Sequence, residues 1–173
     1  MTKKSALKIL IAYENLDAGV RAKKISERVA AQLNSKFNFQ NNLYKFDFLS
    51  HPQLREEATL EAATADVVII SAHEAGDLPY HVKNWMEEWV PCRRKSQSAL
   101  VALLGKDDDD QWKSAVTREF LQQMAERAQM DFFCKTDWPL AVNSLLQRSR
   151  HGIEDDSQNL ETASSDSRWG GND

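Results

Sequence analysis

The sequence predicts an α/β fold, namely a three-layer α/β/α sandwich around a five-stranded parallel sheet with strand order 2-1-3-4-5. Two observations predict it. Short, continuous apolar runs recur along the chain, as in strands that are buried on both faces. Segments with helical periodicity lie between these runs, and strands that alternate with helices pair in parallel through right-handed crossovers.

The first strand and the first helix come from residues 7–36. Residues 7–13, LKILIAY, are an almost continuous apolar run and predict a buried strand. From Ala18 onward, apolar residues recur every three or four positions with charged residues between them. This spacing predicts an amphipathic helix that ends near residues 34–36.

A second strand and a second helix follow. In residues 39–49 apolar and polar residues alternate, which places Tyr44, Phe46 and Phe48 on one face and predicts a half-exposed edge strand. An edge position agrees with the outer place of the second strand in the order 2-1-3-4-5. Residues 52–63 are rich in Glu and Ala, begin with a proline and predict a helix.

The second half of the chain continues the alternation. Residues 65–71 and 98–105 predict the third and fourth strands, and residues 130–135 predict a fifth. Residues 110–129 predict a long helix, and residues 139–150 a last one. The expected buried stripe of the long helix consists of Trp112, Val116, Phe120, Met124 and Ala128.

We expect one domain over residues 1–150 and a flexible acidic tail over residues 151–173. The formal net charge of the 173-residue chain is -4, and the tail alone holds six acidic residues against Arg168. Its apolar content is too low to offset the entropy of ordering it. The remainder is nearly balanced in charge, which argues against a nucleic-acid partner.

The lengths of the apolar runs and the spacing of the cysteines bear on the cellular compartment in which the protein is expected. The longest runs, residues 9–12 and 99–105, are too short to cross a bilayer, so no membrane partner is expected. Cys92 and Cys134 lack the close spacing of a metal pair or a disulfide framework. A reducing, cytoplasmic location is therefore expected.

A ligand of such a sheet binds at the carboxyl ends of the strands, near the point where the strand order reverses. The loops concerned are residues 14–19, 72–79 and 106–111. The first loop, ENLDAG, contains neither Ser nor Thr, and Asp17 is expected to cap the helix that follows it. His73, at the end of the third strand, is the best single candidate for a functional histidine.

The segment GDLPYHVKNWMEEWV, residues 76–90, resembles the loop and helix after the third strand in NAD(P)H-dependent FMN reductases of the flavodoxin-like superfamily. The residues that match are Gly76, Leu78, Pro79, Val82, Lys83, Asn84 and Trp89. The resemblance implies a flavodoxin-like fold and an FMN-dependent NAD(P)H oxidoreductase of the flavin or quinone reductase type. It implies no catalytic side chain, because the chemistry belongs to the flavin.

The same resemblance implies where FMN is held and which partner it meets. The implied cofactor-binding residues are Glu14, Asn15, Asp17, Gly19, His73, Glu74, Gly76, Leu78 and Pro79. The electron partner would be a small molecule or a redox protein.

Two departures from the family pattern favour an alternative, a cofactor-free flavodoxin-like binding or regulatory module. The first loop lacks the hydroxyl groups of a phosphate cradle, and the third loop carries the run from Asp107 to Asp110. No metal site is expected from this run, since adjacent aspartates cannot all reach one ion. A weak divalent-cation site shared with Glu14 or Asp17 stays open.

Trp85 and Trp89 are four residues apart on the helix after this loop, a spacing that favours core packing. Trp89 near the surface beside Arg93 and Arg94 could also serve an interface, so a homodimer is a further expectation. His81 is expected on the exposed side of the helix.

Overall fold

A computed structural model describes residues 5–32, 37–73, 77–93, 98–105 and 115–134. The chain divides into two units after Trp138, and all of these residues belong to the first. The predicted helix at residues 139–150, the domain boundary at residue 150 and the acidic tail lie outside the described residues. No helix within the described ranges is long and apolar enough to cross a membrane.

The sheet has five parallel strands in the order β2-β1-β3-β4-β5, which confirms the predicted fold class. The strands are β1 (Ser5–Tyr13), β2 (Phe37–Lys45), β3 (Val67–Ala72), β4 (Ala99–Leu104) and β5 (Asp131–Cys134). Tyr13, the last residue of β1, pairs with Lys45 of β2 and with Ser71 of β3. The strand order therefore reverses beside the carboxyl end of β1.

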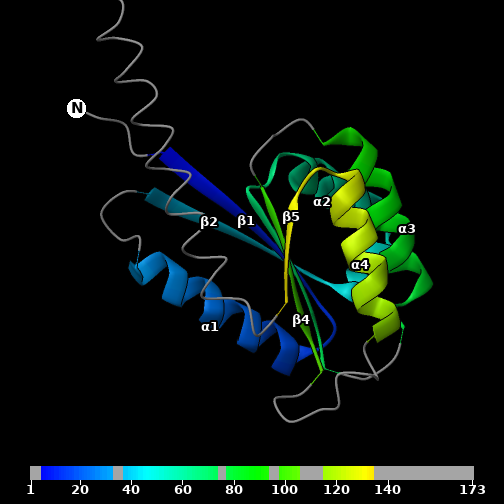
Figure 1. The fold of residues 1–173 in the computed structure, drawn as a ribbon, viewed down its shortest axis with the longest axis horizontal. Helices are drawn as coiled ribbons and strands as arrows, with labels where there is room; N and C mark the ends of the chain where they lie inside the picture. The colour runs from blue at the N-terminus through cyan, green and yellow to red at the C-terminus, as the bar shows by residue number, and fades with distance from the viewer. Residues whose placement is uncertain (1–4, 33–36, 74–76, 94–97, 106–114, 135–173) are drawn as a thin grey trace, which may run out of the picture. The chain divides into compact units, whose positions relative to one another are not determined.

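Helices cover both faces of the sheet (Figure 1). Those that the structure describes are α1 (Leu16–Gln32), α2 (Pro52–Thr64), α3 (Tyr80–Trp89) and α4 (Ala115–Arg127), with short 3-10 helices η1 (Phe46–Ser50) and η2 (Val90–Cys92). Figure 1 shows α1 on one face, and α2, α3 and α4 together on the other.

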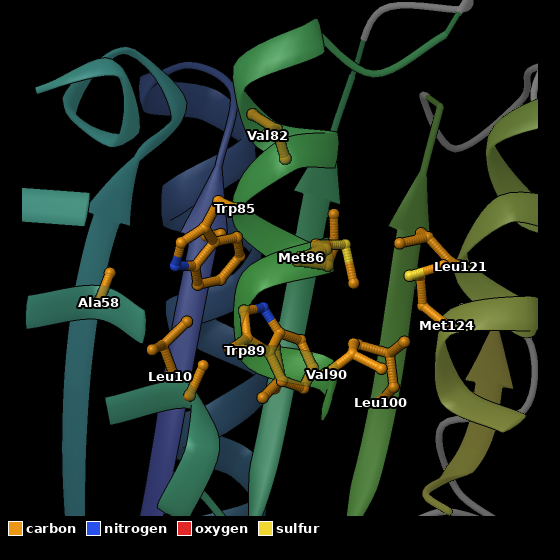
Figure 2. Packing of buried hydrophobic residues seen from close by; sticks show 14 of the residues in the cluster. Leu10, Ala58, Val82, Trp85, Met86, Trp89, Val90, Leu100, Leu121 and Met124 are labelled. Carbon is orange, nitrogen blue, oxygen red and sulfur yellow. The ribbon is translucent and has the colours of Figure 1, made fainter. Parts of the chain in front are cut away.

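The main apolar core lies between the sheet and α2, α3 and α4. Trp85 and Trp89 are both fully buried in it, with ring centroids 5.8 Å apart and planes tilted by 56°, an arrangement that aromatic pairs favour. Figure 2 shows Leu121 and Met124 reaching from α4 toward the same core. The core prediction for both tryptophans is confirmed, whereas a surface position for Trp89 is wrong.

β2 is an edge strand, as predicted, but it ends earlier than expected. The chain turns into η1 after Lys45, and Phe46 and Leu49 are buried while Phe48 is 45% exposed. Residues three apart eclipse one another in a 3-10 helix, so Phe46 and Leu49 share the inner side. The alternation that predicted one face for Tyr44, Phe46 and Phe48 continues in the sequence beyond the end of the strand.

The buried side of α4 differs from the predicted stripe. Thr117, Leu121, Met124 and Ala125 are buried, whereas Val116 is 64% exposed. Residues spaced by four drift around a helix of 3.6 residues per turn by about 40° at each step. Residues chosen by that spacing alone therefore do not all face the sheet, and Val116 is one that faces away from it.

Arg93 lies at the amino-terminal edge of the sheet and binds backbone carbonyl groups there. Its Nη1 donates to the carbonyl oxygens of Ala62, at 2.7 Å, and Ala65, at 2.8 Å. Burial lowers the pKa of Arg93, and the charge of Asp66 partly offsets that effect. Trp89 is buried and so offers no aromatic surface to a partner, and Arg94 lies outside the described residues, so the interface stays a prediction.

Candidate functional site

The candidate site lies where β1, β3 and β4 end. The Glu14 N–H donates to the carbonyl oxygen of Ser71, at 2.9 Å, and the Gly105 N–H donates to that of Ala72, at 2.8 Å. These bonds continue the sheet by one residue beyond the paired strands. The segments that follow β1, β3 and β4 therefore start side by side.

Only Glu14 and Asn15 separate β1 from α1. Asn15 Oδ1 accepts a hydrogen bond from the Ala18 N–H at 2.9 Å, so Asn15 caps the helix. Asp17 was predicted as the cap, and this is wrong: Asp17 is already the second helical residue, and a capping side chain comes from the residue before the first turn. Asp17 is exposed.

Glu14 ties the end of β1 to the end of β3. Its carboxylate accepts the His73 N–H at 2.8 Å, and both residues are half-buried. The structure thus brings together two of the predicted site residues. The Glu14 carboxylate therefore binds the backbone of the segment that follows β3.

Gly19 and Tyr13 are packed against each other at the start of α1. A Cβ atom on Gly19 would lie only 2.9 Å from Cδ2 of the Tyr13 ring, and Gly19 is buried. The missing side chain therefore makes room for the tyrosine ring. We use the name β1–α1 junction for residues 13–19.

Arg21 is a residue of this region that sequence reasoning missed. From α1 its guanidinium reaches the ends of β3 and β4, where Nη1 donates to the Gly105 carbonyl oxygen and Nη2 to that of Leu103, at 2.6 Å. A signal for it was present in the sequence. Arg21 is three residues after Ala18 and directly before Ala22, both of which are buried, so it lies on the helix side that faces the sheet.

After His73 the chain is described again from Asp77 onward, and Glu74 and Gly76 lie outside the described residues. Asp77 Oδ1 accepts the Leu78 N–H at 3.0 Å, and the carboxylate also pairs with Lys83. Leu78 is part of the apolar core, and the exposed Pro79 directly precedes α3. Of the predicted cofactor-binding residues in this segment, Pro79 alone is described at the surface.

His81 joins the start of α3 to η1. Its Nε2 lies 2.8 Å from the Phe46 carbonyl oxygen, and the residue is half-buried. The predicted exposed position is therefore wrong, because the helix docks against η1 through this bond. Phe48 and Tyr80 are near in sequence to Phe46 and His81, the two residues of this bond, and both are exposed.

Five exposed apolar side chains lie near the starts of helices that follow strands. The rim patch, as we call them, consists of Leu16, Val20, Phe48, Tyr80 and Val116. Each of these residues lies among the first five residues of a helix, and that helix is the next one in the chain after a strand. Tyr80 is 78% and Leu16 76% exposed. Because the carboxyl ends of parallel strands meet at one edge of the sheet, these side chains are candidates for a binding surface.

The β1–α1 junction is the place where the resemblance of residues 76–90 implies the FMN phosphate. A phosphate there needs backbone N–H groups that converge at a helix start. The Ala18 N–H is already bound by Asn15, the carboxylates of Glu14 and Asp17 flank the same turn, and the Tyr13 ring fills the space beside Gly19. Within the described residues, no group of three or more His, Cys, Asp or Glu side chains could hold a metal ion, and the Asp107–Asp110 run lies outside them.

No family model and no curated protein matches this chain. Among solved structures it is similar to a short-chain flavodoxin associated with a non-canonical PDU bacterial microcompartment, with a TM-score of 0.53 and 9% identity over 82% of this chain and 98% of that one. It is also similar to Smu.1420 from Streptococcus mutans UA159, with a TM-score of 0.46 and 10% identity over 84% of this chain and 100% of that one. Together with the strand order, the first likeness shows that the chain has the flavodoxin-like fold.

Proposed function

We propose that this chain is a cofactor-free binding module with the flavodoxin-like fold, which binds a protein partner at its rim patch. The observation that carries the proposal is the β1–α1 junction, where the chain's own side chains already bind backbone N–H groups. Asn15 takes the Ala18 N–H, Glu14 takes the His73 N–H, and the Tyr13 ring covers Gly19.

Electrostatics supports the same proposal. A helix start favours an anion because its backbone N–H groups carry partial positive charge. In α1 two carboxylates, those of Glu14 and Asp17, already lie beside that start. A phosphate would have to displace the Asn15 cap and approach both carboxylates, and like charges at close range repel one another.

The rim patch supplies the surface that a binding module needs. Its members lie on η1, α1, α3 and α4, so a partner that covers them contacts several elements at once. The partner that can be tested with the purified chain alone is a second copy, which would form the homodimer expected from the sequence. Burying the five side chains in such an interface would remove their apolar surface from water.

A titration with FMN tests the cofactor-free proposal. The purified full chain is added to a fixed concentration of FMN, and quenching of the flavin fluorescence is followed, with a known flavodoxin titrated in parallel. We expect quenching by the flavodoxin and none by this chain. Saturable quenching by this chain would contradict the proposal.

A second candidate function is the FMN-dependent NAD(P)H oxidoreductase. The resemblance of residues 76–90 favours it, and Lys83 and Asn84 do lie in the first turns of α3 beside the carboxyl edge. Under this candidate the flavin supplies the hydride chemistry, and the chain only binds and orients it. The same titration would give saturable quenching, and the FMN-loaded chain would oxidise NADPH in the presence of a quinone.

The partner surface is tested by sedimentation over a range of protein concentrations. We expect the wild-type chain to self-associate, Leu16→Ser and Tyr80→Ser to weaken that association, and Leu60→Ser to leave it unchanged. Leu60 is the matched control because it is 68% exposed in the middle of α2, away from the rim patch. A wild-type monomer at every concentration, or an equal effect of Leu60→Ser, would contradict a homodimer.

A further inference from the structure

We infer that the carboxyl ends of β3 and β4 form a guanidinium-binding site, which the chain fills with its own Arg21. Arg21 is then a positioning residue, since it fixes the places from which the segments after β3 and β4 leave the sheet. The inference does not rest on the proposed function, because it concerns the sheet edge beneath the candidate site and holds with or without flavin.

The first support is the set of acceptors. Arg21 Nη2 lies 2.6 Å from the Leu103 carbonyl oxygen and 3.3 Å from both the Ala72 carbonyl oxygen and Ser71 Oγ. Nη1 donates to the Gly105 carbonyl oxygen. Four oxygens, from β3, β4 and Gly105, thus surround one planar cation. This geometry suits a guanidinium fork, whereas an ammonium group would act as a single point charge.

The second support is that other bonds hold these acceptors in place. Ser71 is fully buried and donates from Oγ to the Ala18 carbonyl oxygen at 2.9 Å, so its lone pairs are left to accept from Arg21. Gly105 adopts a φ of 75°, a backbone conformation that favours glycine. The Gly105 N–H also binds the Ala72 carbonyl oxygen. The site is therefore built by β3, β4 and Gly105 as well as by the arginine.

Removing the arginine side chain has a definite chemical consequence. Carbonyl oxygens at the buried edge would lose a charged donor, and buried acceptors without donors destabilise a fold. The space left by Arg21→Ala is bounded by oxygens that suit a guanidinium ion. Free guanidinium should therefore bind there and restore what the truncation removes.

The test uses thermal unfolding of the full chain in millimolar guanidinium chloride and in equal sodium chloride. We expect Arg21→Ala to lower the Tm by about 5 °C or more, and guanidinium to restore part of the loss with a saturable dose dependence. Arg28→Ala is the matched control, because Arg28 is exposed on the same helix; its Tm should change little and should not rise with guanidinium. A wild-type Tm for Arg21→Ala, or a lowered Tm that guanidinium does not raise, would overturn the inference.

A second variant covers the case in which Arg21→Ala does not fold. Arg21→Lys keeps the charge and most of the stem but lacks the planar fork. In this variant we expect the Gly105 amide to exchange hydrogen about tenfold faster than in the wild type. The Asp66 amide, which binds the Lys8 carbonyl oxygen at the opposite edge, should keep its rate. Unchanged exchange at Gly105, or equal acceleration at both amides, would overturn the inference.

Discussion

The two faces of the sheet are held to their helices by different physics. Between the sheet and α2, α3 and α4 lie large apolar side chains, including Trp85, Met86 and Trp89 of α3, all fully buried. The face under α1 meets small residues, Ala18 and Ala22, and is joined to the helix by polar groups. The first face is stabilised mainly by aromatic and apolar packing, whereas the second combines buried apolar strand residues, such as Ile11, Ile69 and Leu103, with specific polar contacts.

This difference determines which substitutions matter on each side. On the apolar face, stability should follow the volume that a substitution removes. On the α1 face hydrogen bonds and close contacts contribute as well, so an added methyl group or a lost amide oxygen can also matter there. The following predictions test this contrast from the largest expected effect to the smallest.

Trp85→Ala should have the largest effect, because it opens a cavity in the centre of the apolar face. We expect a loss of about 3–5 kcal/mol in the free energy of unfolding, measured by urea denaturation. Trp85→Phe should lose less, since the Trp85 indole N–H has no hydrogen-bond partner among the described residues and phenylalanine keeps most of the ring. A loss below about 1 kcal/mol for Trp85→Ala would contradict this picture of the core.

Gly19→Ala adds one methyl group to the α1 face, where it would meet the Tyr13 ring at 2.9 Å. We expect a loss of about 1–3 kcal/mol from overpacking, even though alanine is the better helix former. In a Tyr13→Ala background the same change should be neutral or stabilising. Additive effects of the two substitutions in a double-mutant cycle would show that the contact does not exist.

Asn15→Ala removes the cap of α1 and should destabilise the chain by about 1 kcal/mol. Asn15→Asp keeps an oxygen for the Ala18 N–H and is the control, with a stability close to that of the wild type. Asp17→Ala should have a smaller effect than Asn15→Ala, because Asp17 does not cap the helix. The reverse order of these two losses would restore Asp17 as the cap.

Tyr44→Phe should have the smallest effect at neutral pH and a distinctive one in alkali. Burial and the charges of Glu57 and Glu61, with a hydrogen bond to Glu57, raise the pKa of Tyr44 from 10.0 to about 12. The folded state thus favours the neutral phenol, and this contribution is complete below the unfolded pKa of 10.0 and is lost as the pH rises through about 12. Urea unfolding across that range should show wild type losing stability relative to Tyr44→Phe, and parallel curves would contradict it.

The sheet was predictable because each of its inner strands contains a nearly continuous apolar run. Strand alternation with helices then gave the strand order, and Trp85 and Trp89 were placed in the core by their spacing. The end of β2 was not predictable in the same way. The apolar alternation runs on through Phe46 and Phe48, and only the turn into η1 separates the buried ring from the exposed one.

The candidate site was predictable in location and less so in detail. Glu14, Asn15, Gly19 and His73 are at the carboxyl edge as expected, since that follows from topology. Their hydrogen-bond partners are set by tertiary geometry. Predicting Asn15 as the capping residue would have required knowing which residue is the first of α1. Arg21 was overlooked because a charged residue between the apolar positions of a helix is ordinarily solvated. Its acceptors also come from β3 and β4, which are far away in the sequence.

A comparison of FMN with riboflavin tests the central claim, that the β1–α1 junction has no place for a phosphate. Both flavins are titrated against the full chain by fluorescence quenching under identical conditions, and the two differ by the phosphate group alone. We expect no preference for FMN over riboflavin. FMN binding tenfold or more tighter than riboflavin, about 1.4 kcal/mol, would contradict the claim and favour the flavin-dependent oxidoreductase.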